Sequence, residues 1–475
     1  MLAIRLVARC FLVLSLTSVT QSTWAQGSPG WAEDLEFLLK SIDEIHPNPY
    51  GVHSRESFIT AASNLKSQPA ELSEHAAALE IQRLLAMVGD GHTEWARMPE
   101  SLRGDYLPII FRPFVEGWFI RTGDPAYRPL FGKPITGIAG LAIQDVLDRV
   151  LPYVSGENEI GKLDDAANLI RNARVLDALG ITDGIAKTVS FTVLESDGSE
   201  FSIEVAVTDE SWVQPHWRDV DKLLNPNVDE PLYRLLDGNY ACSWLPDDQL
   251  LYVMFSEIRN DNDSTIEEFF GDVYEFASVV RPSKFVLDLR ENSGGNLDLN
   301  GPVLRGLIAN PELDQPRKVF VAIGPDTYSA AMNLSVLLER YTNSLFVGTP
   351  TGATPNHYGD TRVVELPNSK IQVEISELAW QNSDPRDDRP WITPDIPVNP
   401  SAALFIAERD PVLETILDFS PPESLAEEFG PPMARWRRQN QLQEEIWQAL
   451  LSASARPISH VEGGRGLKVE SCSVR

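Results

Sequence analysis

Cysteine and histidine are scarce in this sequence, with three cysteines and seven histidines among 475 residues. They show none of the spacings that are typical of metal ligands, so we expect no metal centre and no cofactor. Cys242 and Cys472 lie in the body of the chain, far apart in sequence. They could form one disulfide, but two free thiols fit their separation at least as well.

Positive charge is also in short supply. The chain has 40 Lys and Arg residues against 69 Asp and Glu residues, which gives a net charge of −29. Such a surface repels phosphate backbones and anionic lipid, so we expect no nucleic-acid partner and no peripheral membrane binding. The charge balance indicates a soluble protein whose copies repel one another. No feature of the sequence specifies an oligomeric state.

Long hydrophobic runs are absent, and the one notable run, residues 10–19, is too short to cross a membrane. It follows Arg5 and Arg9 and precedes a small residue, Ala25. This is the layout of a secretory signal peptide. We therefore expect cleavage near Ala25, a periplasmic or secreted protein, and no stable membrane insertion.

The rest of the chain is expected to form several regions, because 475 residues are too many for one compact core. Apolar residues recur on one helical face through residues 31–45, and the sequence HPNP at 46–49 ends that helix. The expected division is a signal peptide (1–25), an N-terminal helical region (26–104), a small β-rich domain (105–207), a connector (208–240), an α/β domain (241–420) and a C-terminal extension (421–475).

Residues 241–420 alternate buried strands with helices. Strand patterns lie at 251–258, 285–289, 319–323 and 345–348, and a capping box at 264–267 is expected to open a helix. This alternation predicts an α/β domain with a largely parallel sheet. Ligand sites in such sheets gather at the carboxyl ends of the strands.

Two segments at those carboxyl ends contain residues that could take part in catalysis. In the sequence TYSAA (327–331), Ser329 stands where a buried strand turns into a helix. In DLRENSGG (288–295), Gly294 and Gly295 follow another buried strand. A serine at a helix N-terminus and a glycine loop with free backbone amides are two of the parts that acyl transfer needs.

Four segments in order resemble the tail-specific, or C-terminal processing, serine proteases and their tricorn-core relatives. They are DLRENSGGN (288–296), TYSAA (327–331), VGTPTG (347–352) and TPDI (393–396), and GDGHT (89–93) is similar to a motif of the family's N-terminal helical region. The resemblance implies a ClpP/crotonase-like ββα-layered catalytic domain, with a PDZ-like domain in the β-rich middle region.

One departure from the family is informative. The processing proteases use a Ser-Lys dyad, but Thr354 occupies the position of the lysine here. Lys370 follows in what is expected to be a hairpin turn, out of register. A Ser-Lys mechanism is therefore not expected, and the resemblance shifts to the branch that uses serine, histidine and an acid.

The resemblance then suggests a role for each candidate. His92 is the expected general base, because a neutral imidazole can take a proton from the serine and return it to the leaving group. His357 and His46 are its rivals.

The acid lies about sixty residues after the serine in related triad enzymes, which favours Asp388, with Asp387 as the main substitute and Asp384 nearby. The backbone amides of Gly295 and Ala330 would form the oxyanion hole. Asp90 is expected to be a turn residue, and Asp288 and Arg290 to hold the glycine loop.

These residues predict an exported serine peptidase that acts on a polypeptide substrate without a cofactor. The middle domain would bind or gate that polypeptide. Two other classes remain open. The same fold occurs in retinoid-carrying proteins, so an inactive binding protein for an apolar ligand or a peptide is one alternative. A hydrolase of non-peptide esters or amides is the other.

Overall fold

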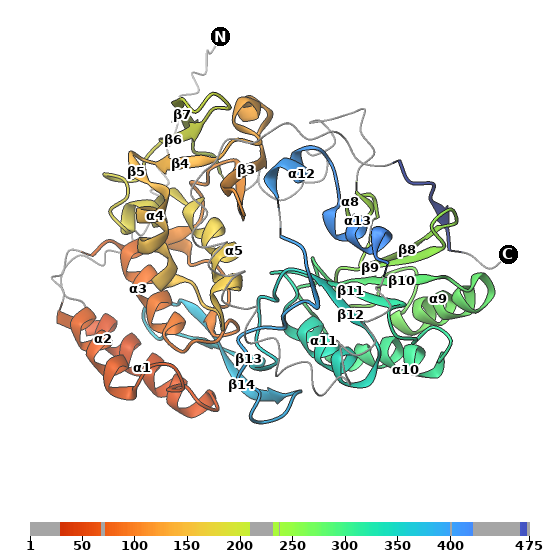
Figure 1. The fold of residues 1–475 in the computed structure, drawn as a ribbon. Helices are drawn as coiled ribbons and strands as arrows, with labels where there is room; N and C mark the ends of the chain where they lie inside the picture. The colour runs from red at the N-terminus through yellow and green to blue at the C-terminus, as the bar shows by residue number, and fades with distance from the viewer. Residues whose placement is uncertain are drawn as a thin grey trace, which may run out of the picture.

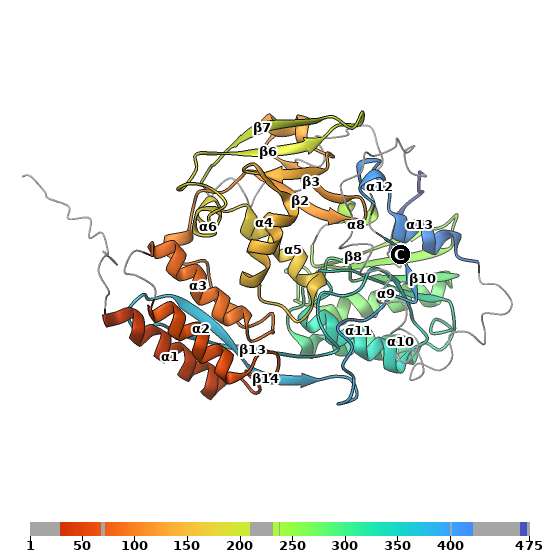
Figure 2. The same cartoon turned by 60° about the vertical axis from the view of Figure 1, so that its left-hand side comes forward.

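The computed structural model describes residues 29–67, 72–209, 231–236, 238–399, 401–420 and 466–472. The expected signal peptide, most of the connector and most of the C-terminal extension lie outside these residues. None of the helices in the described ranges has the length and apolar character needed to cross a membrane. Figures 1 and 2 show the N-terminal helices and the seven-stranded sheet at opposite sides of the molecule, with the middle region above them.

Three helices open the described chain: α1 (Pro29–Ile45), α2 (Arg55–Ser67) and α3 (Glu74–Ala86). The helix expected over 31–45 is confirmed, while α2 was not foreseen. Ser73 caps α3, because its side chain accepts a hydrogen bond from the amide of Ala76. The apolar faces of the three helices pack together in one buried cluster. The loop after α3 carries the GDGHT segment toward the sheet region.

The middle region contains a hairpin and a four-stranded antiparallel sheet in the order β5-β4-β6-β7. Its strands are β2 (Ile109–Phe114), β3 (Gly117–Gly123), β4 (Ile135–Ile138), β5 (Leu141–Ala142), β6 (Thr188–Leu194) and β7 (Glu200–Ala206). Its helices are α4 (Ile143–Val150), α5 (Glu159–Ile170) and α6 (Ala173–Ala178), with 3₁₀ turns at Glu100–Leu102, Pro125–Leu130 and Leu151–Tyr153. One buried apolar cluster joins these elements except the turn at Glu100–Leu102, whose Leu102 packs with the N-terminal helices.

A seven-stranded sheet in the order β15-β12-β11-β10-β9-β8-β16 forms the α/β region. The five strands β9, β10, β11, β12 and β15 run parallel, as expected, and β8 and β16 are antiparallel at one end. The strands are β8 (Tyr240–Leu245), β9 (Leu250–Phe255), β10 (Lys284–Asp288), β11 (Val319–Ile323), β12 (Leu345–Gly348), β15 (Ile396–Pro397) and β16 (Glu470–Ser471).

Helices cover both faces of this sheet (Figure 1). On one face lie α9 (Ile266–Val280), α10 (Gly301–Ala309) and α11 (Ser329–Tyr341), and a 3₁₀ turn at Leu297–Asn300 leads directly into α10. On the other lie α8 (Leu232–Leu235) and α13 (Pro411–Asp418), with α12 (Ala402–Ile406) reaching the middle region.

The capping box of α9 lies one residue later than expected. Both 264–267 and 265–268 fit the Ser/Thr-x-x-Glu pattern, but the helix begins at Ile266. Thr265 is therefore the N-cap, and its side chain accepts from the amide of Glu268 at 3.2 Å. The Glu268 carboxylate accepts in return from the Thr265 amide at 2.9 Å.

A long hairpin leaves the seven-stranded sheet and joins the N-terminal helices. Its strands are β13 (Asn356–Glu365) and β14 (Gln372–Gln381), and β14 pairs with β1 (Glu94–Trp95), directly after the GDGHT segment. Lys370 lies in the turn of this hairpin, as expected, and pairs with exposed Glu365. The hairpin thus links residues 89–93 to the sheet region (Figure 2).

Candidate active site

Ser329 begins α11 immediately after the turn that follows β11. Its φ of 48° is left-handed, a strained conformation for a residue with a Cβ. Thr327 fixes this turn from within: its hydroxyl donates to the carbonyl of Leu289 at 2.8 Å and accepts from the amide of Gly324 at 3.0 Å. Ser329 remains partly exposed, so its hydroxyl can be reached by a substrate.

The glycine loop is tied to the serine turn by Asn292, which sequence reasoning did not single out. Its buried side chain donates to the carbonyl of Phe255 at 2.7 Å and accepts from the amide of Gly294 at 2.9 Å. Its own carbonyl accepts from the amide of Tyr328 at 3.1 Å. A Cβ at Gly294 would lie 2.7 Å from Cβ of Ser329, so only glycine fits against the serine.

Two backbone amides remain available beside Ser329. Within the described residues, the amides of Gly295 and Ala330 donate to no other group of the chain. A Cβ at Gly294 would also lie 2.9 Å from the nitrogen of Ala330, so the glycine loop passes directly against this helix start. Amides in this arrangement can stabilise an oxyanion. The structure therefore places Ser329 beside the amide of Ala330 and against the glycine loop that contains Gly295.

His92 reaches Ser329 from the N-terminal region. Asp90 accepts from the amide of His92 at 2.7 Å, from the hydroxyl of Thr93 and from Nε2 of His46 at 3.1 Å. The expectation that Asp90 is a turn residue is thus confirmed. In this loop, Nε2 of His92 lies 3.0 Å from Oγ of Ser329, across 237 positions of sequence.

Burial lowers the pKa of His92, although the charge of Asp90 opposes this effect. The imidazole is therefore neutral near pH 7, which is the form that can accept the serine proton. Burial alone would raise the pKa of Asp90, but its hydrogen bonds from His46 and Thr93 lower it, so Asp90 is ionised.

The other ring nitrogen of His92 contacts residues that the sequence did not reveal. Nδ1 lies 3.1 Å from the hydroxyl of Tyr328, and that hydroxyl lies 3.3 Å from Oε1 of Glu157. The rings of His92 and Tyr328 are stacked with centroids 4.8 Å apart. Glu157 and Asp90 each place an oxygen 3.9 Å from Nδ1, too far for a direct hydrogen bond.

Glu157 is a buried carboxyl just before α5. Burial, and then the charge of Asp90, raise its pKa to about 8. Backbone hydrogen bonds from its own amide and from Gly91 oppose this rise in pKa. Burial and the nearby carboxylate of Glu157 also raise the pKa of Tyr328 well above its usual value, so the phenol keeps its proton.

The aspartates expected to complete a triad lie elsewhere. Asp388 is exposed and forms no ion pair with His92 in the described chain. Asp387 is buried, but it accepts from Arg389 at 2.9 Å and from the hydroxyl of Ser383. Asp384 pairs with Arg386. The segment folds into a loop bridged by arginines, so the spacing from Ser329 does not carry any of these carboxylates to the histidine.

The two rival histidines, His357 and His46, form hydrogen bonds with nearby residues of the chain. His357 is buried, its Nδ1 lies 3.2 Å from the carbonyl of Thr354, and burial lowers its pKa to about 4. Its ring lies 6.0 Å from that of His92, measured between centroids. Nδ1 of His46 accepts from the amide of Asn48, so its Nε2 donates to Asp90. Thr354 turns its hydroxyl to the carbonyl of Asn356.

Donor atoms of Asp90, His92 and Glu157 lie within 4.8 Å of one another, a spacing that a metal ion could bridge. The hydroxyl of Tyr328 already contacts two of these three side chains, His92 and Glu157. We therefore interpret the cluster as a hydrogen-bonded network around the imidazole.

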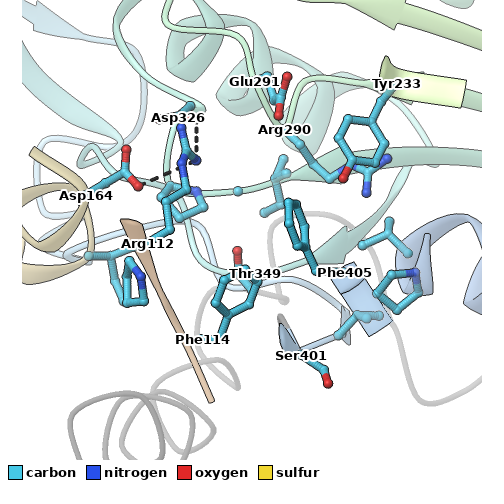
Figure 3. A pocket seen from close by; sticks show the side chains of 18 of the residues that line it. Arg112, Phe114, Asp164, Tyr233, Arg290, Glu291, Asp326, Thr349, Ser401 and Phe405 are labelled. Atoms are coloured by element: carbon cyan, nitrogen blue, oxygen red, sulfur yellow. Dashed lines mark hydrogen bonds and ion pairs between the residues drawn. The ribbon is translucent and has the colours of Figure 1, made fainter. Parts of the chain in front are cut away.

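Asp288 and Arg290 hold the base of the glycine loop, as expected. Nε of Arg290 lies 3.0 Å from both carboxylate oxygens of Asp288, and the guanidinium also pairs with Asp410 at 2.8 Å. Arg290 stacks on Tyr233, and both line a cavity of about 200 Å³ (Figure 3).

The cavity lies between the middle region and the carboxyl ends of β10, β11 and β12. Arg112 extends from β2 between Asp164 of α5 and Asp326, with N–O distances of 3.5 and 3.3 Å (Figure 3). Phe114 and Phe405 contribute apolar walls. Asp326 lies three positions before Ser329, so this ion pair ties the middle region to the turn that carries the serine.

No protein-family model matches the sequence, and no curated protein matches it. The structure of mature CPAF matches with a TM-score of 0.58 at 12% identity, covering 89% of this chain and 98% of that chain. Mature CPAF complexed with lactacystin gives 0.57 at 11% identity, with 89% and 99% covered. The photosystem II D1 C-terminal processing protease gives 0.40 at 15% identity, with 85% and 100% covered. The chain therefore shares the α/β fold of CPAF over most of its length.

Proposed function

We propose that this protein is an exported serine peptidase, with Ser329 as nucleophile and His92 as general base. The observation that carries the proposal is the 3.0 Å approach of His92 Nε2 to Ser329 Oγ, made by two residues from separate regions of the chain. The strained serine, the two available amides and the sequence motifs support the same assignment.

The proposed reaction follows from these positions. Ser329 Oγ attacks the peptide carbonyl while His92 Nε2 takes its proton. The carbonyl oxygen, now negatively charged, accepts hydrogen bonds from the amides of Gly295 and Ala330. His92 then protonates the leaving amine, and water hydrolyses the acyl-enzyme by the same proton transfers. No cofactor takes part in these steps.

In this proposal, Tyr328 and Glu157 replace Asp388 as the partners of His92. For Nε2 to accept the serine proton, Nδ1 must carry the ring hydrogen and donate it to the Tyr328 hydroxyl. That hydroxyl then donates to the ionised carboxylate of Glu157. The chain of hydrogen bonds fixes the tautomer of His92, which is the role that an acid has in a triad.

Cleavage of an unstructured polypeptide tests the proposal. Fluorescein-labelled casein should be degraded by the full chain, and the Ser329→Ala variant should lose at least about 100-fold in rate. Ser278→Ala, an exposed serine on α9, is the matched control and should retain full activity. Equal cleavage by the wild type and Ser329→Ala would show that a contaminating protease, and not this site, degrades the casein.

A further inference from the structure

Cys242 and Cys472 are neighbours in the structure although they lie far apart in sequence. β16 pairs antiparallel with β8, with Ser471 opposite Ser243 and Glu470 opposite Trp244. One position further along the same register, Cys472 stands opposite Cys242. The C-terminal strand thus brings the two cysteines of the described chain face to face.

The geometry of an antiparallel pair suits a disulfide. Opposite residues have Cα atoms about 4.5–5.5 Å apart, and a disulfide requires about 4.4–6.8 Å. A hydrogen bond to the Cys242 thiol, and then burial, raise the pKa of Cys472, which agrees with the two side chains lying side by side in this register. Both side chains are half-buried and pack against the same apolar cluster of the sheet.

The segment around Cys472 is docked on the sheet by a second contact. Leu467 packs against the apolar cluster on the other face of the sheet, among residues that include Leu245 and Leu250. β16 therefore covers the outer edge of β8, which would otherwise present unpaired backbone groups. A two-residue strand is a weak attachment by itself, because it contributes few hydrogen bonds.

We propose that Cys242 and Cys472 form an intramolecular disulfide that fastens the C-terminal segment to the edge of the catalytic sheet. One cysteine thiolate attacks an external disulfide, such as oxidised glutathione or an oxidised dithiol protein, and releases one of its thiols. The second cysteine then displaces the other. The protein loses two protons and two electrons, and the external disulfide gains them. The proposal does not depend on peptidase activity.

Peptide mapping tests the bond. The full chain, never exposed to reductant and equilibrated with oxidised glutathione, is alkylated with iodoacetamide and digested with trypsin. Cleavage after Arg234, Arg259 and Lys468 gives one peptide with Cys242 and another with Cys472. We expect these two peptides to be joined at nearly full yield, and to separate on reduction. Alkylation of both cysteines, capture of glutathione, or a link between two chains would overturn the proposal.

A shifted cysteine provides the matched control. The double variant Ser471→Cys, Cys472→Ser keeps one cysteine in the same tail but moves it to the opposite face of β16. We expect the link to Cys242 to fall at least about tenfold relative to wild type. Equal yields would show that a mobile tail meets Cys242 by chance, and would refute the argument from register. This double variant keeps Cys242, and circular dichroism verifies that its core is folded.

Discussion

Replacing Glu157 by glutamine should remove a pH dependence that the buried network gives to the wild type. With a pKa of about 8, Glu157 is mostly protonated at neutral pH. A protonated Glu157 donates to Tyr328, which then donates to Nδ1 of His92 and leaves the ring hydrogen on Nε2, where it cannot accept the serine proton. Ionisation of Glu157 reverses the direction of these hydrogen bonds.

The expected magnitude follows from the pKa. About one-tenth of the molecules carry ionised Glu157 at pH 7, half at pH 8 and about nine-tenths at pH 9. The rate constant kcat/KM for a fluorogenic peptide should therefore rise roughly tenfold between pH 7 and pH 9. Because burial lowers the pKa of His92, the imidazole is already neutral in this range and contributes no rise of its own.

In Glu157→Gln we expect a flat profile over the same range, with kcat/KM at pH 9 reduced by about 100-fold because the imidazolium loses its negative partner. The assay is a series of initial rates from about pH 6 to about pH 10. A variant that retains the wild-type rise near pH 8 would refute the role of Glu157. So would a wild type whose rate is half-maximal near pH 6.5, the value of an ordinary histidine.

The pH dependence of the free energy of unfolding tests the raised pKa of Glu157 independently. The folded pKa is raised above the unfolded value of 4.5, so the folded state binds the proton more tightly and loses stability as pH rises between about 4.5 and 8. Glu157→Gln removes this loss. The variant should therefore gain on the order of 4 kcal/mol in free energy of unfolding over wild type between pH 4 and pH 9, measured in urea. A difference that stays constant with pH would contradict the raised pKa.

Three further variants test the rest of the site. Tyr328→Phe removes the hydroxyl between His92 and Glu157, so kcat should fall roughly tenfold or more with KM little changed, and the rise near pH 8 should disappear. Gly294→Ala should lower kcat/KM by about 100-fold, because the added Cβ would meet Ser329. Gly198→Ala is the control, because Gly198 also has a positive φ but has open space around it. It should retain activity and lose only about 1 kcal/mol in free energy of unfolding. Asp388→Asn should keep kcat/KM within about twofold, since the side chain is exposed and does not contact His92; a 100-fold loss would restore the sequence-based triad.

The parts of the site that the sequence predicts are those set by local structure. A buried strand followed by TYSAA specifies a strand, a turn and a helix, and so places Ser329 and the amide of Ala330. The two glycines after β10 are also predictable from local structure, because their backbone conformations require glycine. His92 was found through its motif, although its distance from Ser329 depends on how the N-terminal region packs.

The parts that the sequence did not predict depend on tertiary contacts. Glu157 belongs to a loop with no motif, and tertiary packing places it beside Tyr328 and Gly91. The structure places Asp388 away from His92 because a spacing along the chain does not specify a direction. Arg389 turns inward to pair with Asp387 and Glu339, and Asp388 is left exposed. β16 was missed because a two-residue strand has no periodicity to detect.

Covalent labelling with a fluorophosphonate probe tests the central claim most directly. Under native conditions we expect the wild type to be labelled at Ser329, Ser329→Ala to remain unlabelled, and His92→Ala to react at least about 100-fold more slowly. Equal labelling of the wild type and His92→Ala would show that the histidine does not activate the serine. A folded wild type that the probe does not label at all would contradict the peptidase assignment and favour a binding protein on the same fold.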